Sequence, residues 1–407
     1  MGELRTRKRG KTWEYSFEGA KIGGKRKPVS KGGFRTKAEA LAAGTQAKAE
    51  YDSAGRVFTP SNMSLSDYLD YWYKRYVTKL AANTQAGYER HIRLHIKPYL
   101  GHYRLSALEP HIIQNWIDDI LFTQKEMSHQ SMACIAGVLS GSLNYAVQPC
   151  RYLRNNPCDY VKIPDVAIDL ETKKHTEYVC SKDDWEAIMA YFTSTPKHNH
   201  HYLTLLTGYH TGERIGEIYG TDLLQDYDPK KHTLSVNHQL QYEKKKLRYV
   251  NPKYDSFRTI RIDSILERAI KKELIERKRN MMRYGEYYLK TYMLPDKTII
   301  QLSASNSVPD DWKEIYPLGV RENGKILTSV NAKHFSDIIK DKVGLPYFHP
   351  HCLRHTHGTI LAENGASPKT IMERLGHKNI AVTLQRYVFN TDKMQQEAAD
   401  LFERAIQ

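Results

Sequence analysis

The stretch "FHPHCLRHTHGTILAENGASPKTIMERLGHKNIAVTLQRY", residues 348–387, predicts three helical segments separated by clear stop signals. The first helix is expected to begin near His351, directly after Pro350. His351 and Arg354 then lie one turn apart at the positive end of that helix. This arrangement suits an anion such as a phosphate group.

A metal site is the alternative interpretation of the same stretch, because four histidines fall within nine residues. They are His349, His351, His355 and His357. The chain has no H-E-x-x-H pattern and no cysteine at ligand spacing, and the histidine spacings mix the faces of the expected helix. The phosphate interpretation is therefore favoured over the metal.

The second half of the stretch predicts a helix with both ends marked. Ser367 is the expected N-cap, Pro368 takes the first helical position, and Gly376 stops the helix. His377 falls in the break, and the next helix is expected to carry Tyr387. Considered singly, His377 is simply a helix cap and Tyr387 a residue of an amphipathic core face.

A second anion-binding pattern lies upstream in "YHTGERIGEI", residues 209–218. Gly212 is able to end one helix, and Arg214 begins the next, with Glu217 one turn further on. An arginine at a helix start, held by a carboxylate, is well placed to bind phosphate. By itself the pair is equally typical of an exposed ion pair worth about a few tenths of a kcal/mol.

The segment "HTLSVNHQLQYEKKKLRYVNPKYDSFRTIRID", residues 232–263, contains three runs rich in β-branched and aromatic residues. These runs predict a three-stranded antiparallel meander, with Lys253 at the turn between its second and third strands. Residues 279–313 are too long for an ordinary connection and indicate either an insertion or a lid.

Four helices are expected between residues 61 and 168. The first, from Leu65, places five large residues on one face, with Ser64 or Ser66 as its cap: Leu65, Tyr68, Leu69, Trp72 and Tyr76. The second is expected to end at Pro98. The third begins with Pro110 in its first turn, and the fourth covers residues 128–147. Together they predict a compact helical bundle.

The amino-terminal region is strongly basic, because residues 1–37 hold twelve Lys or Arg side chains against three acids. "KTWEYSFEGA", residues 11–20, alternates as a strand does, and residues 21–34 are expected to add a second and a third strand. A helix follows over residues 36–55. We expect a small DNA-binding module of three strands and one helix; a disordered basic arm is the alternative.

Composition limits the class of protein. The 407 residues include 61 Lys and Arg against 46 Asp and Glu, a net charge of +15, which indicates a polyanionic partner. Five cysteines without any C-x-x-C pair indicate reduced thiols. The chain has no apolar run of about 18 residues and no apolar segment behind its basic amino terminus, so a soluble cytoplasmic protein that is not exported is expected.

In chain order, these patterns resemble the signature of the tyrosine recombinase (phage integrase) family. "TGERIGE" supplies the first arginine, "PKYDSFRTI" the lysine, "HCLRH" the His-x-x-Arg, "LGH" the next histidine and "TLQRY" the tyrosine. The last three patterns are separated by 23 and 10 residues, as in the family. One departure is Phe389, where family members often have a histidine two residues after the tyrosine.

The resemblance implies a mainly α, multidomain α+β fold with small β-sheets. An arm-type DNA-binding domain is expected over residues 1–58, a SAM-like core-binding domain over 61–168 and the catalytic domain over 171–407. Lysine and arginine side chains of the first domain are the expected DNA contacts, namely Lys8, Arg9, Lys11, Lys25, Arg26 and Lys27.

The resemblance also implies the chemistry, a DNA transesterification through a 3′-phosphotyrosyl bond that requires no metal or other cofactor. Tyr387 is the expected nucleophile. The other catalytic residues are expected to be Arg214, Lys253, His351, Arg354 and His377, supported by Glu217 and His355.

The implied partners are double-stranded DNA with core-type and arm-type attachment sites, three further protomers in a homotetramer, an excisionase and a host DNA-bending protein. The resemblance further implies a mobile element, either a temperate phage or a conjugative transposon. A chromosome-dimer resolvase and a type IB topoisomerase are alternatives with the same chemistry. A non-enzymatic DNA-binding protein is the alternative from a different class.

Overall fold

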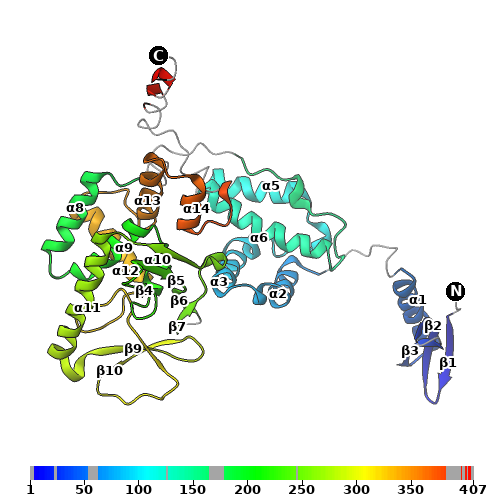
Figure 1. Ribbon diagram of the computed structural model, residues 1–407. Helices are drawn as coiled ribbons and strands as arrows, with labels where there is room; N and C mark the ends of the chain where they lie inside the picture. The colour runs from blue at the N-terminus through cyan, green and yellow to red at the C-terminus, as the bar shows by residue number, and fades with distance from the viewer. Residues whose placement is uncertain are drawn as a thin grey trace. The chain divides into compact units, whose positions relative to one another are not determined.

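The computed structural model describes residues 4–22, 25–53, 63–124, 127–164, 178–243 and 246–381, together with residues 396, 399–400 and 402–404. The chain divides into two compact units, Met1–Val166 and Ala167–Gln407 (Figure 1). Both expected domain boundaries, 58–61 and 168–171, lie outside the described residues, as does Tyr387 with its expected helix.

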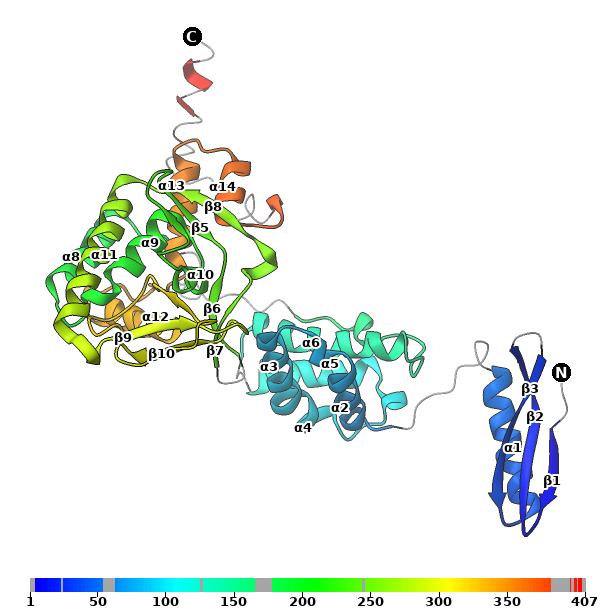
Figure 2. The ribbon, with the colours of Figure 1, turned by 60° about the horizontal axis from the view of Figure 1, so that its bottom comes forward.

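The amino-terminal module forms one antiparallel sheet covered by one helix, as the sequence predicts. Its strands are β1 (Arg5–Arg9), β2 (Thr12–Ile22) and β3 (Lys25–Phe34), in the order β1-β2-β3, and its helix is α1 (Lys37–Ser53). Figure 2 shows α1 lying along the sheet. A Cβ on Gly44 would lie 2.8 Å from the Tyr15 side chain, so the glycine allows α1 to approach β2 closely.

The strand positions within this module differ in part from the prediction. The basic run "RTRKR" is itself the first strand, and residues 21–34 complete β2 and add only one further strand. Alternation of side chains explains the difference, because Tyr15 and Phe17 of β2 face the core, whereas most side chains of β1 are exposed and give no apolar signal.

The helical bundle of the first unit has a continuous apolar core. Its elements are α2 (Leu65–Arg75), η1 (Val77–Lys79), α3 (Ala82–His91), η2 (Ile92–Ile96), α4 (Lys97–Leu100), η3 (Leu105–Ala107), α5 (Pro110–Asp118), η4 (Asp119–Gln124), α6 (His129–Val147) and η5 (Pro157–Tyr160). Ser64 caps α2 by accepting a hydrogen bond from the Asp67 amide. Trp72, Trp116 and Leu139 lie in the shared core, which joins the four expected helices into one body.

Two details of the predicted bundle are wrong. Pro98 does not end the second helix, because Ile92–Ile96 widens into a π-type turn and the proline falls in the first turn of α4, where no amide donor is needed. Tyr76, which was expected on the buried face of the first helix, is 42% exposed, because α2 ends at Arg75.

The second unit surrounds a central helix, α9. Its helices are α8 (Lys182–Ser194), η6 (Asn199–His201), α9 (Tyr202–Thr211), α10 (Ile215–Gly220), η7 (Lys253–Asp255), α11 (Ser264–Tyr284), η8 (Gly285–Tyr287), α12 (Ser329–Ile338), η9 (Ile339–Val343), α13 (Cys352–Glu363) and α14 (Pro368–Leu375). Helix α9 contacts α8, α10, α11 and α13. A Cβ on Gly208 would lie 3.0 Å from Leu353, so α9 and α13 cross closely near the site described below.

The predicted three-stranded meander is wrong, because its runs enter two separate sheets. The strands are β4 (Tyr227–Asp228), β5 (Thr233–Val236), β6 (Gln239–Glu243), β7 (Lys246–Val250) and β8 (Arg258–Arg261). One sheet has the order β4-β5-β8, and β6 pairs only with β7. After β7 the chain passes Pro252 and two residues with positive φ, Tyr254 and Asp255, and this turn brings β8 beside β5.

Lys253 nevertheless occupies the predicted turn, now defined as the connection between β7 and β8. The long segment after α11 forms its own sheet, β10-β9-β11, built from β9 (Leu289–Met293), β10 (Ile299–Ser303) and β11 (Lys313–Ile315). Figure 2 shows this sheet beside the β6-β7 hairpin, and the Tyr249 amide donates to the Lys297 carbonyl at 3.0 Å. Among the described helices, none is long and apolar enough to cross a membrane.

Candidate active site

Arg214 begins α10 with its side chain held by a buried carboxylate. Gly212, with φ +68°, ends α9, and Arg214 is the N-cap of the next helix. Its Nη1 donates to Glu217 Oε1 at 2.8 Å, and its amide donates to Glu217 Oε2 at 3.0 Å. The Glu217 side chain has no exposed surface, so this is not the exposed ion pair that the spacing alone would allow.

Arg354 lies in the first turn of α13, beside the loop that carries Arg214. Its side chain is almost completely buried, and Nη1 donates to the Gly212 carbonyl at 2.8 Å. His351 is the N-cap of α13, as predicted, and the rings of His351 and His355 meet edge to face with 4.8 Å between centroids. The close approach of α9 and α13 thus brings the two arginine patterns together.

His377 follows the end of α14. Ser367, Pro368 and Gly376 hold the predicted positions, and Gly376 has φ +66°. The Gly376 carbonyl accepts a hydrogen bond from Arg214 Nη2 at 3.3 Å. The segment that precedes the expected nucleophile therefore lies against the first arginine.

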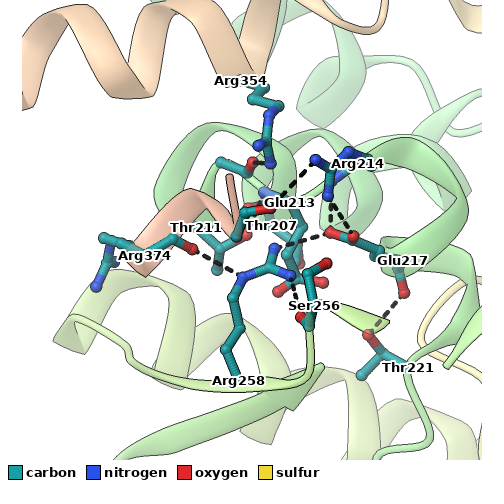
Figure 3. Close-up of polar contacts among 12 residues, drawn as sticks. Thr207, Thr211, Glu213, Arg214, Glu217, Thr221, Ser256, Arg258, Arg354 and Arg374 are labelled. Carbon is teal, nitrogen blue, oxygen red and sulfur yellow. Dashed lines mark hydrogen bonds and ion pairs between the residues drawn. The ribbon is translucent and has the colours of Figure 1, made fainter. Parts of the chain in front are cut away.

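Lys253 is exposed on its turn, with Nζ 5.0 Å from the centroid of the Tyr254 ring. Five residues after Lys253, Arg258 begins β8 and joins the turn to the arginine cluster. Its Nη2 donates to Glu217 Oε2 at 2.8 Å and its Nε to the Arg374 carbonyl at 2.8 Å (Figure 3). Sequence reasoning missed Arg258, because an arginine at a strand start carries no local signal of this role.

Arg374 and His357 form a second contact that sequence reasoning missed. Arg374 Nε donates to His357 Nε2 at 2.9 Å, and His357 Nδ1 lies 2.8 Å from the Tyr209 carbonyl. Burial, assisted by the positive charge of Arg374, lowers the pKa of His357 to about 4. Of the four clustered histidines, His357 therefore supports the packing of α9, α13 and α14.

Glu213, in the loop before α10, and Glu217, within α10, differ in charge because their neighbours differ. Burial raises the pKa of Glu213 to about 7, although Arg258 opposes the shift. Burial alone would also raise the pKa of Glu217, but Arg258 and Arg214 outweigh it and lower that pKa. Near neutral pH the cluster thus holds several guanidinium groups and one fully ionised carboxylate, which leaves it positive and suited to a phosphate.

The remaining predicted site residues are placed as follows. Lys8 and Arg9 lie on β1 and Lys11 in the following turn, all three exposed. Lys25, Arg26 and Lys27 begin β3, and only their backbone is described. In the described part of the chain, no group of three or more His, Cys, Asp or Glu residues is arranged to hold a metal ion.

Comparison with known families agrees with this geometry. Residues 179–394 match the phage integrase family, residues 64–121 the phage integrase N-terminal SAM-like domain, and residues 5–51 an arm DNA-binding domain. The fold and the arginine cluster define the class of tyrosine recombinases, enzymes of site-specific DNA recombination. The chain belongs to the phage integrase family, whose match covers more than half of it.

Individual relatives are distant. The chain is 26% identical over 325 residues to a XerC-like tyrosine recombinase of Caldanaerobacter subterraneus subsp. tengcongensis, covering 77% of this chain and 75% of the relative. It is 25% identical over 316 residues to the transposase from transposon Tn916 of Enterococcus faecalis, covering 77% and 71%.

Two solved structures show the same fold. A complex of the Tn1549 transposon integrase with transposon right end DNA matches with a TM-score of 0.67 and 20% identity, covering 84% of this chain and all of that chain. A lambda integrase tetramer bound to a Holliday junction matches with a TM-score of 0.54 and 16% identity, covering 94% and 95%.

Proposed function

We propose that the protein is the integrase of a mobile genetic element and that Tyr387 is its nucleophile. The observation that carries the proposal is the placement of two arginines on a recombinase fold: Arg354 donates to the Gly212 carbonyl, two residues before Arg214, and Arg214 is held by Glu217. Both guanidinium groups are positioned by the protein before DNA is present. Such preorganised positive charge stabilises the transition state of phosphoryl transfer.

In the proposed reaction, the Tyr387 oxygen attacks the scissile phosphorus and the bond from phosphorus to the 5′-oxygen breaks. One ester bond forms as one is lost, so the phosphotyrosyl linkage retains the energy for rejoining. Arg214 and Arg354 bind the two non-bridging oxygens. The predicted effect of positioned arginines of this kind is on the order of 10³–10⁵ in rate.

Proton transfer is assigned to the remaining polar residues. His351, the N-cap of α13, takes the phenol proton, because a phenol with a pKa of about 10 needs a base near neutral pH. Lys253, exposed on its turn, protonates the departing 5′-oxygen. His377 donates a hydrogen bond to the phosphate, and Glu217 and His355 orient the neighbouring arginine and histidine.

The domains acquire separate roles in this proposal. Residues 1–58 bind arm-type sites, residues 61–168 bind the core site, and residues 171–407 cut and rejoin it. Four protomers act together on two duplexes, with an excisionase and a host DNA-bending protein as accessory factors, on nucleoid DNA in the bacterial cytoplasm. The DNA in the Tn1549 integrase complex and the tetramer on the lambda Holliday junction support DNA and the homotetramer as partners.

A chromosome-dimer resolvase is the second candidate, favoured by the similarity to a XerC-like recombinase. The arm DNA-binding match over residues 5–51 favours an integrase. Deletion of residues 1–58 distinguishes the two. An integrase should lose recombination between sites that carry arm sequences, whereas a resolvase should keep it.

The defining test is capture of the covalent intermediate. The protein is expressed in a bacterium that carries the element and is then purified under denaturing conditions. The DNA that remains covalently attached to it is sequenced. That site is then synthesised as a nicked duplex that loses a short fragment on cleavage, so that the adduct accumulates. The wild type and Tyr287→Phe, a control at an exposed tyrosine, should form the adduct. An undiminished adduct with Tyr387→Phe would falsify the assignment.

A further inference from the structure

We propose that Arg258 is a positioning residue for strand cleavage, which holds Arg214, the Lys253 turn and the segment before His377 in one arrangement. The inference rests on the proposed recombinase function and adds a residue to it. Arg258 is 8% exposed in its side chain and donates to three separate segments of the second unit. It therefore acts through other residues and not by contact with DNA.

The three donors of Arg258 each have a defined acceptor. Nη2 donates to Glu217 Oε2 at 2.8 Å, Nε to the Arg374 carbonyl at 2.8 Å, and Nη1 to the Ser256 carbonyl at 3.1 Å (Figure 3). These acceptors belong to α10, to α14 and to the turn that carries Lys253. Only a planar guanidinium offers donors in three fixed directions, so lysine cannot replace these contacts.

Glu217 transmits the effect to Arg214, because the two arginines bind different oxygens of its carboxylate. Arg214 Nη1 donates to Oε1 and Arg258 Nη2 to Oε2, each at 2.8 Å. One negative charge is thus shared between two positive groups. Without Arg258, Glu217 would neutralise Arg214 alone, and Arg214 would attract the scissile phosphate less strongly.

The guanidinium also supports the segment before His377. A Cβ on Gly376 would lie 2.9 Å from Arg258 Nη1 and 3.1 Å from Cζ, so the Gly376 backbone rests directly on the group. The carbonyl of the same glycine accepts from Arg214 Nη2. Loss of Arg258 would therefore remove one contact with Gly376 directly and weaken the other, which Arg214 makes.

The test compares cleavage of three nicked duplexes of identical sequence. The first has an ordinary scissile phosphate. The second has a methylphosphonate, which is uncharged and therefore depends less on charge stabilisation by Arg214. The third has sulfur in place of the 5′-bridging oxygen, a leaving group that needs no proton from Lys253. Wild type, Arg258→Ala, Arg258→Lys and the control Arg268→Ala, an exposed arginine of α11, are compared under single turnover.

We expect Arg258→Ala to cleave the ordinary phosphate about 100-fold more slowly than the wild type, the order of loss caused by a misplacement of about 1 Å. The deficit should shrink to less than about 10-fold on the methylphosphonate or the sulfur-containing duplex. The cleavage rate of Arg258→Lys on the ordinary phosphate should lie between those of Arg258→Ala and the wild type. The rate of Arg268→Ala should match that of the wild type. Changing one atom of the DNA would not repair a merely unfolded protein.

An equal deficit on all three duplexes, or none on the first, would overturn the positioning role. If Arg258→Ala lacks a cooperative melting transition, Arg258→Lys is used for the same comparison. Failure of the wild type to form an adduct would instead overturn the recombinase proposal itself. The two failures are therefore distinguishable.

Discussion

Arg374 Nε lies 2.9 Å from His357 Nε2, and this contact fixes the protonation of the imidazole. An arginine only donates, so Nε2 must accept and the ring proton must be on Nδ1, which then donates to the Tyr209 carbonyl. His357 is therefore neutral, and both its nitrogens are used. The contact joins the α14 arginine to the α13 histidine.

The neutral His357 makes stability depend on pH. Its pKa in the folded protein is about 4, below the ordinary 6.5, so only the unfolded chain binds the proton between these values. Its stabilising effect is present above pH 6.5 and is lost as the pH falls toward 4.

As the pH falls from 7 to 4, the free energy of unfolding should decrease less for His357→Gln than for the wild type. We expect the two decreases to differ by about 3 kcal/mol. Urea titrations at successive pH values measure it, with His111→Gln, an exposed histidine, as the control. His200 and His201 also have lowered pKa values and contribute to the pH dependence of every variant. The contribution of His357 is therefore taken as the difference between the curves of the wild type and His357→Gln. Parallel curves for the wild type and His357→Gln would contradict the expectation.

Removal of the shared carboxylate should be costly, because it leaves two guanidinium groups close together without their counterion. We expect Glu217→Ala to lower the free energy of unfolding by about 3–5 kcal/mol. Glu276→Ala, which removes a carboxylate that is 42% exposed and paired with Arg279, should change it by less than about 0.5 kcal/mol. Denaturant unfolding decides the point; equal effects of the two substitutions would show that Glu217 is not a buried counterion.

Gly376 and Gly365 allow backbone strain to be separated from contact with Arg258. Both have positive φ, +66° and +77°, but only Gly376 lies against Arg258, whereas Gly365 has open space around it. We expect each alanine variant to lose about 1 kcal/mol or more from strain alone, and Gly376→Ala to lose more than Gly365→Ala. Only Gly376→Ala should slow strand cleavage. Equal cleavage rates would show that the Gly376 contact does not matter to the site.

The amino-terminal basic residues should appear in the salt dependence of DNA binding. We expect the triple variant of Lys8, Arg9 and Lys11 to alanine to weaken binding to arm-type DNA and to lower the slope of log K against log salt by up to about 3. A control that removes the same charge from exposed lysines of the second unit uses Lys272, Lys278 and Lys333. Fluorescence anisotropy across a salt series measures the slopes, and equal slopes for all proteins would rule out this interface.

Local signals in the sequence predicted the helix ends around the site correctly. Gly212, Ser367 and Gly376 act within one turn of their own position, so a short stretch is sufficient to place them. Pro98 shows the limit of such reasoning, because its effect depends on the π-type turn before it. The strand runs were recognised but their partners were not, since pairing depends on where the turn at Lys253 directs the chain.

The order and spacing of Arg214, Lys253, His351, Arg354, His377 and Tyr387 were determined by the sequence, and with them the family. Tertiary structure alone decided how the described members are held. Arg258 meets Glu217 across 41 residues and Arg374 across 116, and Arg354 meets Gly212 across 142. No local pattern encodes such contacts, because they exist only when α13, α14 and β8 have packed against α10 and the loop before it.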